Sequence, residues 1–307
     1  MVRTLKRYRY ILLFILLLSA GVLWREMGHG AARELRVHFL NVGQGDATLI
    51  ETPSGNQVLI DGGPKQTVVQ ELARIIPFWD RSIDLVVLTH PQLDHLSGLV
   101  GVLERYRVER LMLNGAVYRL AAYETLLRMA EEKQIPVVLA RAGQTFALGG
   151  GATATVLNPT DAVIERTPSR AVNETSVVFR LDYGKTSFLF TGDAGFDTEE
   201  RLGQTAENFL DVDILKVGHH GSKYASSEAF LAIVTPRVAA IEVGTGNTYG
   251  HPTPETLHRL ASMGATVFRT DTDATVTIAT DGNAASRSMP ARCPLFCRTQ
   301  AQPLFTE

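Results

Sequence analysis

The 307-residue sequence has few cysteines, few aromatic residues and no excess of charge of either sign. Its two cysteines, Cys293 and Cys297, lie close to the C-terminus, and no other ligands stand nearby to complete a zinc site with them. A thiolate zinc centre is therefore not expected. For this pair, a local disulfide and two free thiols both remain open.

The charge balance argues against one class of protein. The chain has 30 Lys and Arg residues against 32 Asp and Glu residues, so it carries no general basic field that would attract nucleic acid. A nucleic-acid substrate would need a local basic patch or a bound cation to offset its phosphates. Apolar residues make up 45% of the sequence, which allows a substantial buried core.

Long apolar runs are also scarce, and the one that occurs is at the N-terminus. It covers residues 10–24 and follows the basic residues Arg3, Lys6, Arg7 and Arg9. A basic flank followed by an apolar run predicts a signal anchor or a cleaved signal peptide, although the run is short for a membrane span of about 20 residues. The positive-inside rule then places the rest of the chain outside the cytoplasm, either anchored to the membrane or secreted.

Beyond this segment the apolar pattern predicts a mixed α/β domain. A β-hairpin opens each half, around the turns at residues 53–56 and 183–184, and strands then alternate with helices. Residues 158–172 are polar and contain prolines, which predicts a surface loop. We expect a layered α/β sandwich. Its boundaries are a signal segment and linker at residues 1–33, the sandwich at residues 34–282, and an irregular tail at residues 283–307.

The first motif that carries chemistry is HPQLDH at residues 90–95. It directly follows an apolar strand pattern, DLVVLT, and precedes a helical one. The carboxyl ends of strands are where α/β folds place their sites. Three potential ligands, His90, Asp94 and His95, therefore leave one strand end together. Imidazole and carboxylate groups suit divalent ions such as Zn²⁺ and Mn²⁺.

Two further apolar strands end in similar groups. The motif TGD ends one of them with Asp193, whose two carboxylate oxygens allow it to bridge two ions. The motif KVGHHGSK ends the other with His219 and His220, beside the basic Lys223. Because adjacent side chains point in different directions, we expect at most one of the two histidines to be a ligand. The other would support the site or act as an acid or base.

Two weaker signals complete the set. His251, in the motif YGHP, stands just before a predicted helix, where anions are favoured. Asn173 and Ser176 stand where the chain enters a predicted strand.

Taken in order, HPQLDH, TGD, KVGHHGS and YGHP resemble the motifs of the metallo-β-lactamase fold superfamily. The combination of NVGQGD, VGHHGSKYASS and YGHP is closer still to the C-terminal soluble hydrolase domain of ComEC-type competence proteins. The resemblance covers about residues 35–281 and places Asp61 in the superfamily's DGG motif. It implies a four-layer αββα sandwich that holds one or two divalent ions, Zn²⁺ or Mn²⁺, at its edge.

The resemblance also implies roles for individual residues. The implied metal ligands are His90, Asp94, His95, Asp193 and His219. The expected catalytic residues, which would orient water, move a proton or hold an anion, are Asp94, His220, His251 and Lys223.

The sequence departs from the superfamily pattern at one metal position. The usual motif is HxHxDH, but its second histidine is replaced here by Gln92, and no histidine occurs between His95 and Asp193. Asn173 and Ser176 match a polar pair of ComEC-type domains, where many superfamily members have a ligand histidine. A single-ion site, a weak site and a site for an oxygen-preferring ion such as Mn²⁺ all remain open.

The expected chemistry is metal-assisted hydrolysis, and three functions are compatible with it. The first is a phosphodiesterase or nuclease that acts on extracellular DNA, as in DNA uptake. The second is a hydrolase of small esters or lactones. The third is a catalytically degenerate accessory module. The expected partners are a nucleic-acid or other phosphodiester substrate and, through the N-terminal segment, a membrane. With one long apolar run, the chain is not expected to form a DNA channel itself.

Overall fold

The computed structural model of the chain describes residues 10–21, 34–288 and 302–305. The chain divides into two units, residues 1–33 and residues 34–307. In the first unit, residues 10–21 form a helix with exposed side chains. Among the described residues, no helix is both long and apolar enough to span a membrane. The rest of the N-terminal segment lies outside the described residues. Cys293 and Cys297, near the other end of the chain, also lie outside them.

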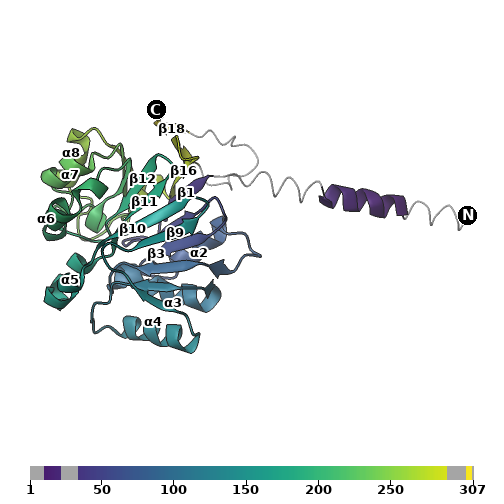
Figure 1. Cartoon of the computed structure of the whole chain (residues 1–307), viewed down its shortest axis with the longest axis horizontal. Helices are drawn as coiled ribbons and strands as arrows, with labels where there is room; N and C mark the ends of the chain where they lie inside the picture. The colour runs from purple at the N-terminus through teal and green to yellow at the C-terminus, as the bar shows by residue number, and fades with distance from the viewer. Residues whose placement is uncertain (1–9, 22–33, 289–301, 306–307) are drawn as a thin grey trace, which may run out of the picture. The chain divides into compact units, whose positions relative to one another are not determined.

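Two β-sheets pack face to face in the second unit, and helices cover their outer faces (Figure 1). In spatial order, the strands described for the first sheet are β18 (Gln302–Phe305), β17 (Ala285–Ser288), β16 (Val276–Thr280), β1 (Leu35–Phe39), β2 (Thr48–Glu51), β3 (Gln57–Ile60), β5 (Leu85–Leu88), β7 (Leu111–Leu113) and β8 (Val137–Leu139). Those of the second sheet are β15 (Thr266–Arg269), β14 (Val238–Ile241), β13 (Ile214–Lys216), β12 (Thr186–Phe190), β11 (Val178–Tyr183), β10 (Ala152–Asn158) and β9 (Thr145–Gly149). A separate small pair is formed by β4 (Ser82–Ile83) and β6 (Arg107–Val108).

The helices divide between the two sheets. The first sheet is covered by α2 (Thr67–Ile75), α3 (Leu93–Arg105) and α4 (Ala121–Glu132). The second is covered by α6 (Phe196–Thr205), α7 (Glu228–Val234) and α8 (Pro254–Ser262). The shorter elements are α5 (Asp161–Arg166), α9 (Thr270–Asp273) and the 3₁₀ turns η1 (Ser169–Thr175), η2 (Glu207–Phe209) and η3 (Gly218–Gly221).

Three apolar cores hold these layers together. The central core lies between the sheets, where Phe190 of β12 packs 4.9 Å from Phe179 and 6.3 Å from Phe39, measured between ring centroids. The other two cores lie between each sheet and its helices. Each large side chain buried in this way contributes about 1.5–3 kcal/mol. The predicted α/β sandwich is therefore confirmed, with layers in the order helix, sheet, sheet, helix.

Strand direction brings the candidate site residues to one edge. In the first sheet β3, β5, β7 and β8 are parallel, and β1 runs the same way because it and β3 are both antiparallel to β2. In the second sheet β12, β13, β14 and β15 are parallel. The loops that follow β3, β5, β12 and β13 carry the predicted motifs. The carboxyl ends of parallel strands thus position the site.

A close backbone contact fixes the helix that carries part of the site. Gly98 of α3 lies so close to the carbonyl oxygen of Gly62, just after β3, that an added Cβ would overlap it. The backbone N–H of Gly98 also donates to the carbonyl of Gly63 at 3.0 Å. Glycine at position 98 therefore allows α3 to begin against the end of β3.

We expect Gly98→Ala to destabilise the fold by about 1–3 kcal/mol, because the helix must shift away from β3. The matched control is Gly101→Ala, where the nearest atom to an added Cβ belongs to the flexible Gln66 side chain, 3.2 Å away. Urea unfolding of the two variants measures the difference. Equal stabilities would contradict this role for Gly98.

Two segments differ from the sequence-based expectation. The predicted irregular tail instead contains β17, which pairs with β16 and buries Ala285, followed by β18. The sequence ASRS of β17 lacks the apolar alternation of a strand, and its Arg287 forms an ion pair with Asp273 at 3.0 Å. The predicted loop at residues 158–172 contains α5, which Thr160 caps by accepting from the backbone N–H of Val163.

Candidate metal centre

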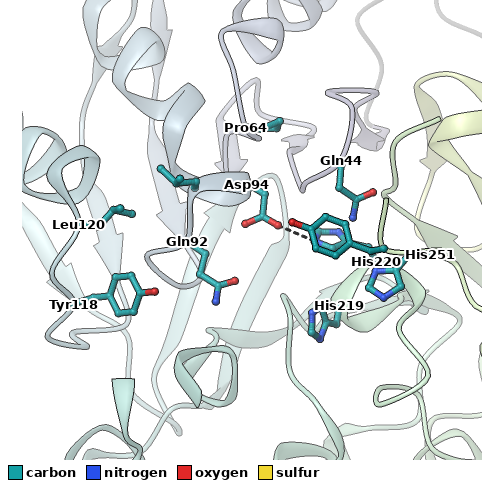
Figure 2. A pocket seen from close by; sticks show the side chains of 11 residues that line it. Gln44, Pro64, Gln92, Asp94, Tyr118, Leu120, His219, His220 and His251 are labelled. Atoms are coloured by element: carbon teal, nitrogen blue, oxygen red, sulfur yellow. Dashed lines mark ion pairs between the residues drawn. The ribbon is translucent and has the colours of Figure 1, made fainter. Parts of the chain in front are cut away.

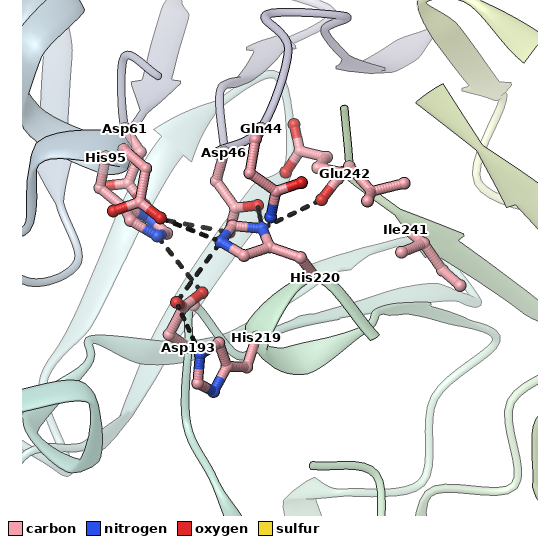
Figure 3. A network of polar contacts seen from close by, with 12 residues as sticks. Gln44, Asp46, Asp61, His95, Asp193, His219, His220, Ile241 and Glu242 are labelled. Atoms are coloured by element: carbon pink, nitrogen blue, oxygen red, sulfur yellow. Dashed lines mark hydrogen bonds and ion pairs between the residues drawn. The ribbon is translucent and has the colours of Figure 1, made fainter. Parts of the chain in front are cut away.

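Four predicted site residues converge at the edge between the two sheets. Figure 3 shows His95, Asp193 and His220, and Figure 2 shows Asp94 beside His220. Asp94 and His95 lie in the first turn of α3, after β5, and Asp193 follows β12. His220 lies in η3, after β13. One donor atom from each of these residues lies within 4.8 Å of the others, and we call the four residues the donor group.

The spacing in the donor group suits a metal ion. Nε2 of His220 lies 3.4 Å from Oδ2 of Asp94 and 3.5 Å from Oδ2 of Asp193. Nε2 of His95 lies 3.3 Å from Oδ1 of Asp193. Tetrahedral ligands about 2.1 Å from a zinc ion would be about 3.4 Å apart. The observed separations match that value.

Unpartnered atoms give an independent test of the fit. Nε2 of His95, Nε2 of His220 and Oδ1 of Asp193 are buried and have no hydrogen-bond partner. A buried polar atom without a partner costs about 1–3 kcal/mol, so such atoms are rarely left unsatisfied. These three atoms belong to the same donor group. A divalent cation there would satisfy all of them together, and the residues therefore fit the ion that the sequence implies.

A carboxylate orients each of the two imidazoles from behind. Nδ1 of His95 lies 2.8 Å from Oδ2 of Asp61, and Nδ1 of His220 lies 3.0 Å both from Oδ1 of Asp46 and from the backbone carbonyl oxygen of Glu242, to which it is hydrogen-bonded. Asp61 is itself held by the backbone N–H and hydroxyl of Thr89, at 2.8 and 2.7 Å. Carboxylates behind ligating histidines fix the ring orientation and raise ligand basicity.

Behind Asp46 lies the buried Lys216, which was not among the predicted site residues. Nζ of Lys216 forms an ion pair with Asp46 and donates to the carbonyl of Gly192 at 3.0 Å. Glu242 accepts from the backbone N–H of Ala47 at 3.1 Å, and its pKa is raised to about 8 by burial and by Asp46. In the sequence, the indication of this buried network is a lysine within the otherwise apolar segment ILKV.

The buried charges are strongly coupled to one another. Burial alone would lower the pKa of His95, but Asp193 and Asp61 raise it well above its usual value. Burial likewise opposes charge on His220, but Asp193 and Asp46 raise its pKa to about 10. Burial would raise the pKa of Asp193, and the neighbouring imidazoles instead hold it well below its usual range. The carboxylates of the site thus stabilise positive charge on the imidazoles. A bound cation would supply positive charge at the same place.

The two adjacent histidines take different places at the site. His220, expected as a catalytic residue, belongs to the donor group, and His219, expected as the ligand, does not. Both residues adopt left-handed backbone conformations, with φ of 47° and 52°. This conformation turns the His220 ring inward, whereas Nε2 of His219 lies 3.9 Å from Asp193 at the more exposed side of the site. Such strain typically occurs at functional sites.

His90 lies beside the donor group but not in it. Its ring is fully buried, 4.2 Å from the ring of His95 between centroids, and its Nε2 lies 4.0 Å from Oδ2 of Asp193. Burial and the neighbouring His95 lower the pKa of His90 to about 3. The potential ligands of the HPQLDH motif thus lie close together, but the fully buried His90 is outside the donor group.

A cavity of about 590 Å³ opens over the donor group (Figure 2). Figure 2 shows Tyr118 and His251 on opposite sides of Asp94. Burial lowers the pKa of His251 to about 4, and its buried Nδ1 has no partner. The residues that line the cavity are Gln44, Pro64, Gln92, Leu93, Asp94, Tyr118, Leu120, His219, His220, Tyr249 and His251.

Lys223 differs from the expectation. It is exposed, its Nζ lies 5.1 Å from the ring centroid of Tyr224, and it does not line the cavity. Tyr118 and Tyr249, which do line the cavity, were not predicted as site residues, although Tyr249 is the first residue of the YGHP motif.

Together, the fold and the donor group define the class of protein. The family model described as the metallo-beta-lactamase superfamily matches residues 40–244, and the chain belongs to this superfamily. The matched segment contains the whole donor group. The superfamily fold and a His/Asp cluster suited to a divalent ion are therefore established together.

Three curated relatives are named as competence or recombination proteins. The chain is 28% identical over 260 residues to ComE operon protein 3 of Bacillus subtilis, covering 79% of this chain and 33% of that protein. It is 32% identical over 235 residues to Recombination protein 2 of Haemophilus influenzae, covering 74% and 27%. It is 28% identical over 263 residues to Competence protein ComA of Neisseria gonorrhoeae, covering 84% and 34%. These relatives agree with the ComEC-type resemblance, and the chain spans about a third or less of their length.

Solved structures show the same fold at low sequence identity. The metallo-beta-lactamase fold protein YhfI from Bacillus subtilis superposes with a TM-score of 0.54 at 12% identity, covering 80% of this chain and 99% of that chain. CmlA from Streptomyces venezuelae, a diiron beta-hydroxylase, gives a TM-score of 0.52 at 14% identity, covering 79% and 53%. At these identities the likeness extends to the fold alone.

Proposed function

We propose that this chain is a metal-dependent phosphodiesterase that acts on nucleic acid. The observation that carries the proposal is the set of unpartnered donor atoms of His95, Asp193 and His220 beneath an open cavity. A divalent cation bound there supplies Lewis-acid activation of water and offsets negative charge on a phosphate. The competence and recombination relatives support nucleic acid as the phosphodiester.

The chain's own residues add polar groups around the reacting position. The rings of His219 and His251 lie 5.7 Å apart between centroids, and both line the cavity. With its low pKa, His251 is neutral at neutral pH, so it would offer an N–H group rather than a charge to a phosphate oxygen. No Lys or Arg of the described residues lines the cavity, so the cation would offset most of the phosphate charge.

An exposed aromatic ring at the cavity supports a nucleic-acid substrate. The side chain of Tyr249 is 69% exposed, and its ring stacks on that of His251 at 5.9 Å and 26°. Exposed aromatic rings bind single-stranded nucleic acids by stacking on bases, at about 1–3 kcal/mol per base. In the proposed function, Tyr249 would hold a base next to the reacting phosphate.

We expect Tyr249→Ala to raise the KM for single-stranded DNA by about 5- to 150-fold, because one stacked base is lost. Hydrolysis of a small chromogenic phosphodiester should change little, since that substrate has no base to stack. Tyr224→Ala is the control, because Tyr224 is 61% exposed and does not line the cavity. Equal losses on both substrates would argue against a stacking role.

A small ester or lactone is the second candidate substrate. The near-neutral net charge and the absence of basic side chains among the described cavity residues favour it over nucleic acid. A panel containing single-stranded DNA, a small phosphodiester and an aryl ester, each with Mn²⁺ and with Zn²⁺, separates the candidates. Metal-dependent DNA cleavage supports the proposal, and turnover of the ester alone replaces it. Turnover of none of the three would favour an accessory module of DNA uptake.

We also propose that the enzyme works outside the cytoplasm, either membrane-anchored or secreted. The proposal rests on the basic residues before position 10 and the apolar run that follows them. A reporter that is active only outside the cytoplasm, fused after residue 307, tests it. Activity of the reporter supports the proposal, and a silent but stably expressed fusion contradicts it.

A further inference from the structure

Beside the donor group lies the position where the sequence lacks two imidazoles. The groups that stand there are His90, Gln92 and Asn173, together with Oδ2 of Asp193. In the part of the chain that the structure describes, the convergent sets of three or more metal-ligating side chains include neither His90 nor His219. This second position therefore differs from the donor group in its ligands.

The carboxylate of Asp193 determines which groups donate and which accept in the hydrogen bonds at the second position. An ionised carboxylate can only accept, so Nδ2 of Asn173 donates to Oδ2 of Asp193 at 3.5 Å. Oδ1 of Asn173 then accepts from Nε2 of Gln92 at 2.8 Å. Oε1 of Gln92 then faces Nε2 of His90 at 3.2 Å and accepts from it in the tautomer that carries the proton on this nitrogen. We call Gln92 and Asn173 the amide bridge.

The other ring nitrogen of His90 has two hydroxyl neighbours. Nδ1 lies 3.4 Å from Oγ of Ser176, which is able to donate to it, and 3.1 Å from Oγ1 of Thr89, whose own proton goes to Asp61. Oγ of Ser176 in turn accepts from the backbone N–H of Asp193 at 3.2 Å. His90, Gln92, Asn173, Asp193 and Ser176 thus form a closed ring of hydrogen bonds. Both nitrogens of the buried His90 have partners, in contrast to the unpartnered nitrogens of the donor group.

This arrangement disfavours an ion at the second position. Binding there would require Gln92 to give up its contact with Nε2 of His90 and the amide bridge to come apart. In return the ion would gain one imidazole, a shared carboxylate and amide oxygens, which are weak ligands for zinc. At the donor group, an ion instead satisfies atoms that have no other partner.

We propose that each chain binds one divalent cation, at Asp94, His95, Asp193 and His220, and that the amide bridge closes the second position. The inference concerns the number of ions and holds whether the substrate is a nucleic acid or a small ester. The replacement of a histidine by Gln92 left three alternatives open for this metal position. The proposal selects the single-ion site among them.

The test is the metal content of the full chain. Chelator-treated protein is dialysed against Mn²⁺ or Zn²⁺ over a range of concentrations, and bound metal per chain is measured by mass spectrometry. We expect one tightly bound ion in the wild type and two in Gln92→His/Asn173→His, which supplies the missing imidazoles. Bound Mn²⁺ should give the paramagnetic resonance spectrum of an isolated ion in the wild type and of a spin-coupled pair in the double variant.

A matched control is Gln44→His, which adds an imidazole to the cavity lining outside the amide bridge. It should retain one ion. Two tightly bound ions in the wild type, or none, would overturn the proposal. A second ion in Gln44→His, or its absence in a double variant that keeps the wild-type circular dichroism, would show that the bridge does not decide the count. The wild-type count remains a valid test if the double variant does not fold.

Discussion

Replacing Asp193 by alanine is expected to remove bound metal and hydrolytic activity together. Its carboxylate contacts both imidazoles of the donor group, at 3.3 Å for His95 and 3.5 Å for His220. Loss of a residue that supports a metal ligand costs about 10–100-fold in metal affinity, and loss of a ligand should cost at least that much. Metal content and turnover, measured on the same preparation, check the prediction.

A thermal shift gives a second readout that does not depend on substrate. Metal at 100 times its Kd stabilises the wild type by about 2.7 kcal/mol, which raises Tm by about 5–10 °C. Asp193→Ala should show no such shift, whereas the control Asp197→Ala, at an exposed position in α6, should show the full shift. Retention of metal and activity by Asp193→Ala would contradict the proposed site.

Replacing Lys216 by methionine is expected to destabilise the fold by about 3–5 kcal/mol, because it leaves the buried charge of Asp46 without its main partner. Both side chains are almost fully buried, with 3% and 4% exposed. Burial and Asp46 raise the pKa of the neighbouring Glu242 to about 8, and Lys216 opposes that shift, so its charge also acts on this second carboxyl group. Urea unfolding in the presence of a chelator measures this effect separately from metal binding.

A double variant separates the structural role of this pair from its role at the metal centre. Lys216→Met/Asp46→Asn removes both charges, so part of the lost stability should return. Metal affinity should nevertheless fall by about 10–100-fold, because His220 loses the carboxylate that orients it. Unchanged stability of Lys216→Met, or full metal affinity in the double variant, would contradict these roles.

The sequence predicted the residues that follow strands directly. Asp94, His95 and Asp193 come together because buried strands of both sheets end at the same edge, and an apolar run followed by polar groups makes each strand end visible. The layered sandwich was predictable for the same reason, since strands and helices alternate along the chain.

The residues behind the metal centre could not be predicted in this way. Asp46 and Lys216 are 170 positions apart in the chain, and their ion pair depends on how the two sheets pack. The choice between His219 and His220 depends on left-handed backbone angles that residue type does not reveal. The strand β17 is defined by its pairing with β16 rather than by an apolar pattern of its own.

The most direct test of the central claim is an anomalous difference map from crystals of the protein grown with Mn²⁺. The claim predicts a peak about 2.0–2.2 Å from donor atoms of Asp94, His95, Asp193 and His220. A second peak beside His90 would contradict only the inference of a single ion. Absence of density among the donor atoms in metal-saturated crystals would contradict the metal centre itself.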